Sequence, residues 1–279
     1  MPAAGPREAA VADRLRINRF FTEHGVTSRR AADRYVEAGR VKINGVLAKL
    51  GDTVGQDDEV TLDGERIGQA VKRPVVLAYH KPPGIECTSD PRVPDNIIDA
   101  VGYPERIFHI GRLDKFSEGL ILLTNRGELV NQILRARGLH EKEYVVDVDL
   151  PISSNTLGRM RNGIEILGRL TAPCQAERLG PRTLRMVLIE GRNRQIRRMC
   201  EAEGLRVRRL VRVRVMNIEL GSLPRGRWRE LSPRELSELE RRIARAEARQ
   251  AALGPAGGRA PGDGGARADD GDDSDDSDD

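Results

Sequence analysis

Cysteine, histidine and aromatic residues are scarce in this 279-residue sequence. The three cysteines, Cys87, Cys174 and Cys200, lie far apart, and the four histidines are dispersed. Because no CxxC pair or other close Cys/His spacing occurs, the sequence predicts no zinc site. Aromatic residues make up 3% of the chain, so we expect a core built from Val, Leu, Ile and Ala.

Long apolar segments are also absent. No run approaches the roughly 18 apolar residues of a membrane-spanning helix. Residues 1–13 are rich in Ala and Pro but contain no continuous apolar stretch, so they do not resemble a secretory signal. We therefore expect no membrane partner, and a cytoplasmic, reducing environment in which the three thiols stay free.

Lysine is rare, because only six of the 47 basic residues are Lys. A genome rich in G and C explains the preference for Arg, but it does not explain an excess of positive charge. From Gly254 onward two Arg face nine Asp, which gives −7, whereas residues 1–253 carry 45 basic and 34 acidic residues, or +11. A body this basic predicts a polyanionic partner, most simply a nucleic acid.

Composition divides the chain into four segments. We expect a flexible leader over residues 1–13, a compact basic unit over 14–72, and a larger body over 74–240, with residues 69–73 as the linker between the two units. Residues 254–279 contain Gly, Ala and Pro followed by Asp and Ser, and cannot bury apolar surface. We expect this acidic tail to be disordered, and to serve as a solubilising segment or an electrostatic competitor for the basic body.

The basic unit has the pattern of two helices followed by short strands. Leu15, Ile17, Phe20 and Phe21 supply the apolar positions of a first helix that Gly25 ends. Ser28 is expected to cap a second helix from Arg29 to about Ala38. The strand 41–43 is followed by Asn44-Gly45, a strong hairpin signal, and further strands are expected at 58–62 and 66–67.

Five positive charges lie on and after the second helix: Arg29, Arg30, Arg34, Arg40 and Lys42. A charged helix face is usually only solvated, but five charges on one small fold favour a surface that contacts phosphates. The run Thr27 to Gly45 resembles the S4-type RNA-binding domain, and the similarity covers residues 14–72. This resemblance implies binding of structured RNA.

The body is expected to be α+β and built on a mostly antiparallel mixed sheet with flanking helices. Strands are predicted at 74–79, 119–123, 143–148, 183–189 and 206–215. Helices are predicted at 128–135, 153–161, from a cap at Asn193 to Gly204, and at 232–252. No regular alternation of strand and helix occurs that would indicate a parallel sheet.

One carboxylate of the body, Asp114, directly precedes a strongly apolar strand. It follows the turn Gly111-Arg112-Leu113, and the strand from Gly119 to Leu123 comes after it. A carboxylate beside a buried strand is costly to desolvate unless something pairs with it. Asp114 is therefore a candidate nucleophile or general base, with a surface loop before a core strand as the alternative.

Four motifs in the body resemble those of the pseudouridine synthases that carry an N-terminal S4-type domain. They are His80-Lys81-Pro82-Pro83-Gly84, then Gly111-Arg112-Leu113-Asp114 with Ser117 and Gly119-Leu120, then Glu141-Lys142-Glu143-Tyr144, and finally Asn193 to Met199. Ser117 stands where many members have Thr, which preserves the hydroxyl. The resemblance runs from residue 14 to about 240 and implies the catalytic fold of that family.

The resemblance implies isomerisation of uridine to pseudouridine, a reaction without redox change that needs no cofactor and no metal. It makes Asp114 the essential carboxylate, which either attacks the sugar or assists elimination. It makes Tyr144 the ring-stacking residue and general base, and Arg197 the salt-bridge partner of the carboxylate. An ordinary core tyrosine and a surface arginine are the alternatives for the last two.

RNA contacts are implied for further residues of these motifs. Arg112 is expected to fill the space that a flipped base leaves in the RNA stack. Lys81 and Arg194 are expected to contact RNA, together with the five cations of the first unit.

Some runs resemble in particular the F-type, large-subunit subfamily; these are Asp95 to Asp99, His140 to Tyr144, Arg208 to Asn217 and Arg227 to Leu231. That subfamily implies a uridine of 23S rRNA near the peptidyl-transferase centre as the substrate, with a tRNA anticodon as a further one. We expect a monomer, because the helix at 232–252 is too charged for a dimer interface. The alternatives are a synthase for another rRNA uridine, a non-catalytic RNA-binding or ribosome-assembly factor, and a protein that binds nucleic acid through charge alone.

Overall fold

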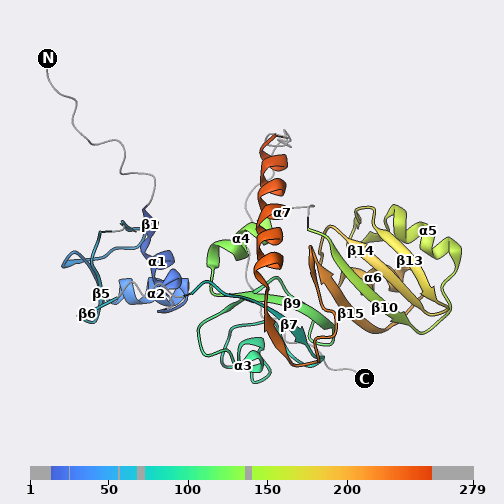
Figure 1. Ribbon diagram of the computed structural model, residues 1–279, viewed down its shortest axis with the longest axis horizontal. Coiled ribbons are helices and arrows are strands. Elements are labelled where there is room, and N and C mark those ends of the chain that lie inside the picture. Colours follow the sequence, from blue (N-terminus) through green and yellow to red (C-terminus); the bar gives the residue numbers. More distant parts are fainter. Residues whose placement is uncertain (1–13, 25, 56, 68–72, 136–139, 253–279) are drawn as a thin grey trace, which may run out of the picture.

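A computed structural model describes residues 14–24, 26–55, 57–67, 73–135 and 140–252. The expected leader, the acidic tail, Gly25 and most of the expected linker lie outside the described residues. Figure 1 shows a small N-terminal unit beside a larger body, in which helices flank one sheet.

The N-terminal unit packs two helices against short strands. Its apolar core includes Ile17, Phe20 and Phe21 from the first helix, and Ala32 and Val36 from the second. β1 pairs with β4, and β3, β2, β5 and β6 form a four-stranded sheet in that order. The elements are β1 (Leu15–Arg16), α1 (Ile17–Glu23), α2 (Arg29–Glu37), β2 (Val41–Ile43), β3 (Val46–Leu47), β4 (Thr53–Val54), β5 (Val60–Leu62) and β6 (Glu65–Arg66).

Local signals in this unit predicted its elements well. Ser28 Oγ accepts a hydrogen bond from the Ala31 amide at 3.2 Å, which confirms the helix cap. Asn44 and Gly45 have φ angles of 51° and 82°, as a tight hairpin turn between β2 and β3 requires. The assignment of Leu15 to the first helix was wrong, because Leu15 pairs with Val54 across a two-stranded sheet.

The body is built on a nine-stranded sheet. The strand order is β13-β14-β10-β15-β9-β7-β17, with β16 paired to β15 and β8 paired to β9. Of the pairings between these strands only β15 with β9 is parallel, which confirms the mostly antiparallel α+β prediction. The strands are β7 (Val76–Lys81), β8 (Phe108–Ile110), β9 (Glu118–Thr124), β10 (Lys142–Val148), β13 (Gln175–Gly180), β14 (Thr183–Leu188), β15 (Val207–Val215), β16 (Ile218–Glu219) and β17 (Trp228–Glu230).

Helices cover the sheet through three apolar clusters. α4 (Gly127–Arg135) and α7 (Pro233–Ala252) share a cluster with β9 and β15, whereas α5 (Ser154–Asn162) and α6 (Gln195–Ala202) share another with β10 and β14. The short α3 (Ile97–Val101) packs on β7 and β9. Among the described helices none is both long enough and apolar enough to cross a membrane.

The sequence did not predict every element. It missed α3, the strands β1, β4, β8, β13, β16 and β17, and the hairpin of β11 (Glu165–Ile166) and β12 (Arg169–Leu170). On α7, Leu239 is 0% exposed and Ile243 is 3% exposed, both packed in the body's core. The packed body therefore extends past residue 240, where the sequence analysis ended the catalytic domain.

Gly119 allows the close approach of β9 to β15 that joins the two halves of the sheet. Its φ angle is 115°, and a Cβ at this position would collide with the backbone of Arg212, its partner in the parallel pairing. Only glycine fits such a position without strain. The join lies five residues after Asp114, so it fixes where the strand that follows this carboxylate begins.

Candidate active site

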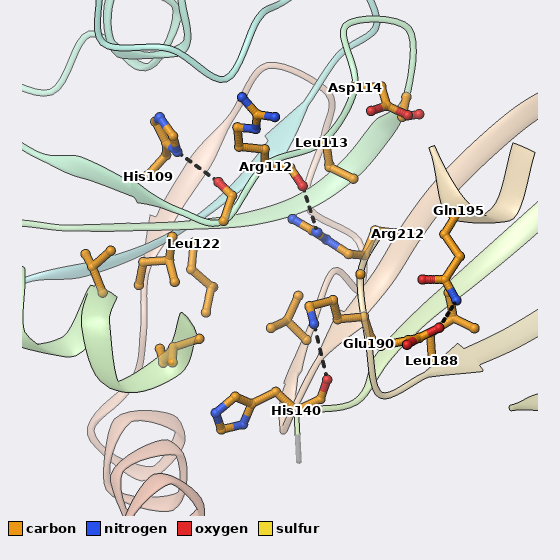
Figure 2. A pocket seen from close by; sticks show the side chains of 18 of the residues that line it. His109, Arg112, Leu113, Asp114, Leu122, His140, Leu188, Glu190, Gln195 and Arg212 are labelled. Atoms are coloured by element: carbon orange, nitrogen blue, oxygen red, sulfur yellow. Dashed lines mark hydrogen bonds between the residues drawn. The ribbon is translucent and has the colours of Figure 1, made fainter. Parts of the chain in front are cut away.

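A cavity of about 1390 Å³ opens where β8, β9, β10 and the start of α6 meet. Figure 2 shows Asp114 and Arg112 on one side of it, Glu190 and Gln195 on another, and Arg212 between Asp114 and His140. The cavity thus collects residues from motifs that lie more than 80 positions apart in the sequence. Three of the four motifs, all except His80 to Gly84, contribute lining residues.

Asp114 lies on a turn between β8 and β9. Gly111 has a φ angle of 72°, and the Ser117 amide donates a hydrogen bond to the Asp114 carbonyl at 3.0 Å. Leu113 is buried, and its amide donates to the Cys87 sulfur at 3.3 Å. These contacts hold the half-buried Asp114 side chain at the wall of the cavity.

Lys81 is buried and bonded within the protein, so the prediction that it contacts RNA was wrong. Its side chain is 0% exposed, and its ammonium group donates to the carbonyls of Pro82, Ile85 and Lys115 at 2.8 to 3.0 Å. Burial lowers the pKa of Lys81 to about 8. The Lys115 carbonyl also accepts from the Gly84 amide, so Lys81 ties the turn after β7 to the turn that carries Asp114.

Arg197 projects from α6 towards the same turn but does not form the predicted salt bridge. Its Nη2 donates to Ser117 Oγ at 3.4 Å, and within the described residues no Arg197–Asp114 ion pair occurs within 4.0 Å. The buried Nε of Arg197 has no partner there either. Burial lowers the pKa of Arg197, Arg194 lowers it further, and the charge of Asp114 opposes both effects. Arg197 thus interacts with the charge of Asp114 while its hydrogen bond goes to the hydroxyl of Ser117.

Tyr144 lines the cavity from β10. Its side chain is half-buried and packs against two of the apolar clusters, one around α6 and one around α3. The ring therefore packs in the core and also lines the cavity. Lys142, two residues earlier on the strand, lines the same cavity.

The entry to α6 differs from the expected cap. Asn193 does not cap the helix; Arg194 is the N-cap residue, with a φ angle of 48° and no side-chain cap bond. Gln195 instead uses its side chain to fix the turn, because its Oε1 accepts from the Arg192 amide at 3.0 Å and its Nε2 donates to Glu190 at 2.8 Å. This turn presents the exposed Arg194 at the cavity.

Arg112 is exposed at the cavity, two residues before Asp114. Its side chain makes no hydrogen bond or ion pair with the described residues, whereas its carbonyl accepts from Arg212 Nη1 at 3.4 Å. The backbone of Arg112 is therefore anchored while its guanidinium is available to another molecule.

Positive charge dominates the cavity. Two carboxylates, Asp114 and Glu190, are among its described lining residues, and Glu190 is already bonded to Arg192 and Gln195. Seven Arg and Lys side chains line it: Arg29, Arg106, Arg112, Lys142, Arg192, Arg194 and Arg212. A hollow with this balance favours a polyanion.

Arg212, Lys142 and His140 were not identified as site residues from the sequence. Arg212 is one of five arginines in the stretch 206–215, and spacing does not distinguish a buried one from its exposed neighbours. The signal that was present for Lys142 is its position two residues before Tyr144, which places both side chains on the same face of a strand.

The basic residues of the N-terminal unit form an exposed face. Arg29, Arg30 and Arg34 are exposed on α2 and make no ion pair with the described residues. Arg40 forms a two-pronged ion pair with Asp63 and stacks over the Tyr35 ring at 4.5 Å. Lys42 is exposed on β2. The α2 arginines therefore offer more available charge than Arg40 does.

Nothing in the described part of the chain forms a metal site. Groups of three or more His, Cys, Asp or Glu close enough to hold an ion do not occur there. The described residues of the cavity supply two carboxylates, a phenol, two imidazoles and several cations.

Comparison with known proteins gives matches to two family models. Residues 75–202 match RNA pseudouridylate synthase, and residues 16–60 match the S4 domain. These two ranges correspond to the body and to the N-terminal unit.

Curated relatives cover most of the chain. The sequence is 47% identical over 226 residues to "Dual-specificity RNA pseudouridine synthase RluF" of Escherichia coli (strain K12), which is 81% of this chain and 78% of that protein. It is 34% identical to "Ribosomal large subunit pseudouridine synthase B" of Bacillus subtilis (strain 168), over 80% of this chain and 95% of that protein. A solved structure described as "Crystal structure of pseudouridylate synthase" matches with a TM-score of 0.59 and 30% identity, over 81% of this chain and 99% of the other.

Proposed function

The chain belongs to the RNA pseudouridylate synthase family, and we propose that it isomerises a uridine of ribosomal RNA to pseudouridine. The observation that carries the proposal is the position of Asp114, a carboxylate at the wall of a cavity lined by seven cationic side chains. A binding-only protein would have no use for an acid at the centre of a surface that attracts phosphates.

The reaction breaks the N1–C1′ bond of uridine, rotates the uracil and forms a C5–C1′ bond, after which C5 loses its proton and N1 carries one. Asp114 is the group that acts on the ribose, either by attack on the sugar or by assisting elimination, because it is the carboxylate among the described cavity residues that is not already bonded to cationic and amide side chains. Tyr144 lines the same space, which supports the proposal that its ring stacks on uracil and its oxygen accepts the C5 proton. The reaction transfers no electrons and loses no group, so this proposal includes no cofactor.

Arg197 supplies a positive charge close to Asp114. The charge of Asp114 in turn raises the pKa of Arg197 against the effect of burial. The hydrogen bond from Arg197 to Ser117 connects α6 to the turn of Asp114. In the substrate complex we propose that Arg197 closes onto Asp114 and forms the salt bridge that is open in this structure.

The target base must leave the RNA stack before it can reach Asp114. Extrusion of a base costs a few kcal/mol, which contacts from the protein must offset. Arg112 is exposed two residues before Asp114, and its side chain makes no hydrogen bond or ion pair with the described residues. We propose that its guanidinium occupies the vacated position in the stack, while Arg194 and the α2 arginines contact the backbone.

The names of two relatives support the large ribosomal subunit and more than one kind of RNA as targets, since one is called a large-subunit synthase and the other dual-specific. From the resemblance to the F-type subfamily we propose a uridine of 23S rRNA near the peptidyl-transferase centre, with a tRNA anticodon as a second substrate. We further propose that the protein acts as a monomer, since α7 is rich in charged residues. We also propose that it acts in the cytoplasm.

The test is to incubate the protein and its Asp114→Ala variant with an unmodified 23S rRNA transcript and with a tRNA transcript. Pseudouridine is then mapped by primer extension after carbodiimide treatment. We expect one new stop with the wild type and none with Asp114→Ala, although both proteins bind the RNA. Binding without a new stop in either transcript would contradict the proposed substrate and favour a binding-only role.

A further inference from the structure

A second group of polar side chains lines the cavity beyond Asp114, and no step described above uses it. It consists of Arg212 on β15, Lys142 on β10, and His140 just before β10. Arg212 and His140 are each 3% exposed, and Lys142 is half-buried. Buried cations are rare unless they are paired, so their partners require an account.

Arg212 has no acidic partner among the described residues. Its Nε donates to the Leu120 carbonyl at 2.7 Å and its Nη1 to the Arg112 carbonyl at 3.4 Å. Neutral carbonyls orient the guanidinium but do not neutralise its charge, and Nη2 is left without a partner in the described structure. The Arg212 guanidinium is therefore oriented in advance and has a donor available for an anion.

Lys142 and His140 likewise lack an acidic partner among the described residues. The Lys142 ammonium makes one long hydrogen bond, to the His140 carbonyl at 3.4 Å. Neither ring nitrogen of His140 makes a hydrogen bond of standard geometry with the described residues, and the Gln132 backbone nearby raises the pKa of the ring against the effect of burial. Burial lowers the pKa of Lys142 to about 8, and the neighbouring charge of Arg212 acts in the same direction. Two like charges are thus held together without a counter-charge, which is unfavourable until an anion enters.

We propose that Lys142, Arg212 and His140 form a subsite for one phosphodiester group of the substrate strand, adjacent to the nucleotide presented to Asp114. The inference rests on the proposed function, because a flipped nucleotide carries its flanking phosphates into the protein with it. Figure 2 shows Arg212 between Asp114 and His140, so the subsite extends away from the reacting carboxylate rather than around it. Arg212 and Lys142 supply the charge, and the imidazole of His140 supplies a neutral donor.

The uracil ring, which carries negative charge once N1–C1′ is broken, is the competing anion for these side chains. The two occupants predict different kinetics. A phosphate contact exists in the ground state and contributes to RNA affinity, whereas a contact to the detached base exists only after bond cleavage and contributes to the rate alone.

The test measures RNA affinity in the Asp114→Asn background, where no turnover interferes, and turnover in the otherwise wild-type protein. Lys142→Gln removes the charge, Lys142→Arg retains it, and Arg245→Gln removes a charge from the exposed face of α7 as a matched control. We expect Lys142→Gln to weaken binding about tenfold at low salt and to reduce the slope of log K against log salt by about 1. Lys142→Arg and Arg245→Gln should change neither quantity.

A modified substrate identifies the partner of Lys142. Replacing single phosphates beside the target uridine by neutral methylphosphonates should weaken binding of the Asp114→Asn protein at one position. At that position Lys142→Gln should cost no further affinity, because both changes remove the same contact. The inference would be overturned if Lys142→Gln lowered RNA affinity by the same factor with and without the methylphosphonate at every position tested. It would also be overturned if Lys142→Gln lowered the rate but left the affinity and the salt slope unchanged.

These outcomes are separate from those of the proposed function. If the wild-type protein forms no pseudouridine in either transcript, the proposed reaction fails, whatever Lys142 binds. If the wild type forms pseudouridine and Lys142→Gln binds and reacts as the wild type does, the subsite fails while the reaction stands.

Discussion

Arg197 Nη2 donates a hydrogen bond to Ser117 Oγ at 3.4 Å, across 80 positions of sequence. Ser117 is 1% exposed and follows the turn that carries Asp114. The bond thus connects the helix that supplies the cation with the loop that supplies the carboxylate. It sets the position from which Arg197 would approach Asp114 when RNA is bound.

Ser117→Ala is expected to lower the single-turnover rate of pseudouridine formation about tenfold. The loss follows because Arg197 loses its hydroxyl partner and its buried guanidinium is no longer oriented. Ser117→Thr keeps the hydroxyl and should retain most of the rate. Equal rates for Ala and Thr variants would show that the hydroxyl does not position Arg197.

Gly119→Ala is expected to destabilise the fold by more than about 3 kcal/mol, because the new Cβ meets the Arg212 backbone at a φ angle that alanine disfavours. Urea denaturation followed by circular dichroism measures the change. Gly158→Ala on α5 is the control, since its Cβ has open space and alanine favours a helix. A loss below 1 kcal/mol at Gly119 would mean that β9 and β15 can separate locally at little cost.

RNA affinity is expected to fall as the pH rises from 7 to 9. The pKa of Lys142 in the free protein is about 8, below its usual value, so the ammonium loses its proton across this interval and its attraction for phosphate with it. The charged or titratable groups beside Lys142 are Arg212 and His140, and burial lowers the pKa of His140 away from this range. Lys142→Arg should make the affinity nearly constant from pH 7 to 9. A fall of the same size in that variant would assign the titration to another group.

The same depressed pKa has the opposite consequence for folding stability without RNA. Lys142 binds its proton more weakly in the folded than in the unfolded chain, so its contribution to the free energy of unfolding increases as the pH rises from about 8 towards 10.5. Comparing the pH dependence of stability in the wild type and Lys142→Gln isolates this contribution. The curves should converge as the pH approaches 10.5.

Glu235→Ala is expected to destabilise the protein by about 1–2 kcal/mol. Glu235 accepts hydrogen bonds from the Ser232 amide at 2.8 Å and from Arg229 at 2.7 Å, while its own amide donates to Ser232 Oγ. Arg229 holds the pKa of Glu235 at about 2, so this stabilisation is present above pH 4.5 and is lost as the pH falls towards 2. Glu247→Ala, on the exposed side of the same helix, is the control and should change the midpoint of thermal unfolding little.

The sequence predicted best where a local signal decides the structure. Ser28 capped its helix and Asn44-Gly45 formed its hairpin because the determining contacts lie within a few residues. Asn193 failed as a cap because the helix begins one residue later, with Arg194 as its N-cap residue, and the Asn193 side-chain oxygen accepts from Arg198 Nη2 at 3.2 Å instead.

The site was harder to predict because burial depends on contacts between distant parts of the chain. Motif resemblance located Asp114 and Tyr144 at the cavity, but it could not show that Lys81 is enclosed by three carbonyls. It likewise could not distinguish buried Arg212 from the exposed arginines of the same strand.

The position of β15 in the sheet has a consequence for synthesis on the ribosome. β15 lies between β10 and β9, although it is made long after both, so each of these strands keeps an unpaired edge until residues 207–215 emerge. Within the described sheet, β15 joins the half that carries Asp114 to the half in which β10 carries Tyr144. A nascent chain therefore holds no assembled catalytic cavity until about three-quarters of it has been translated, and a chain that stops earlier exposes two strand edges to aggregation.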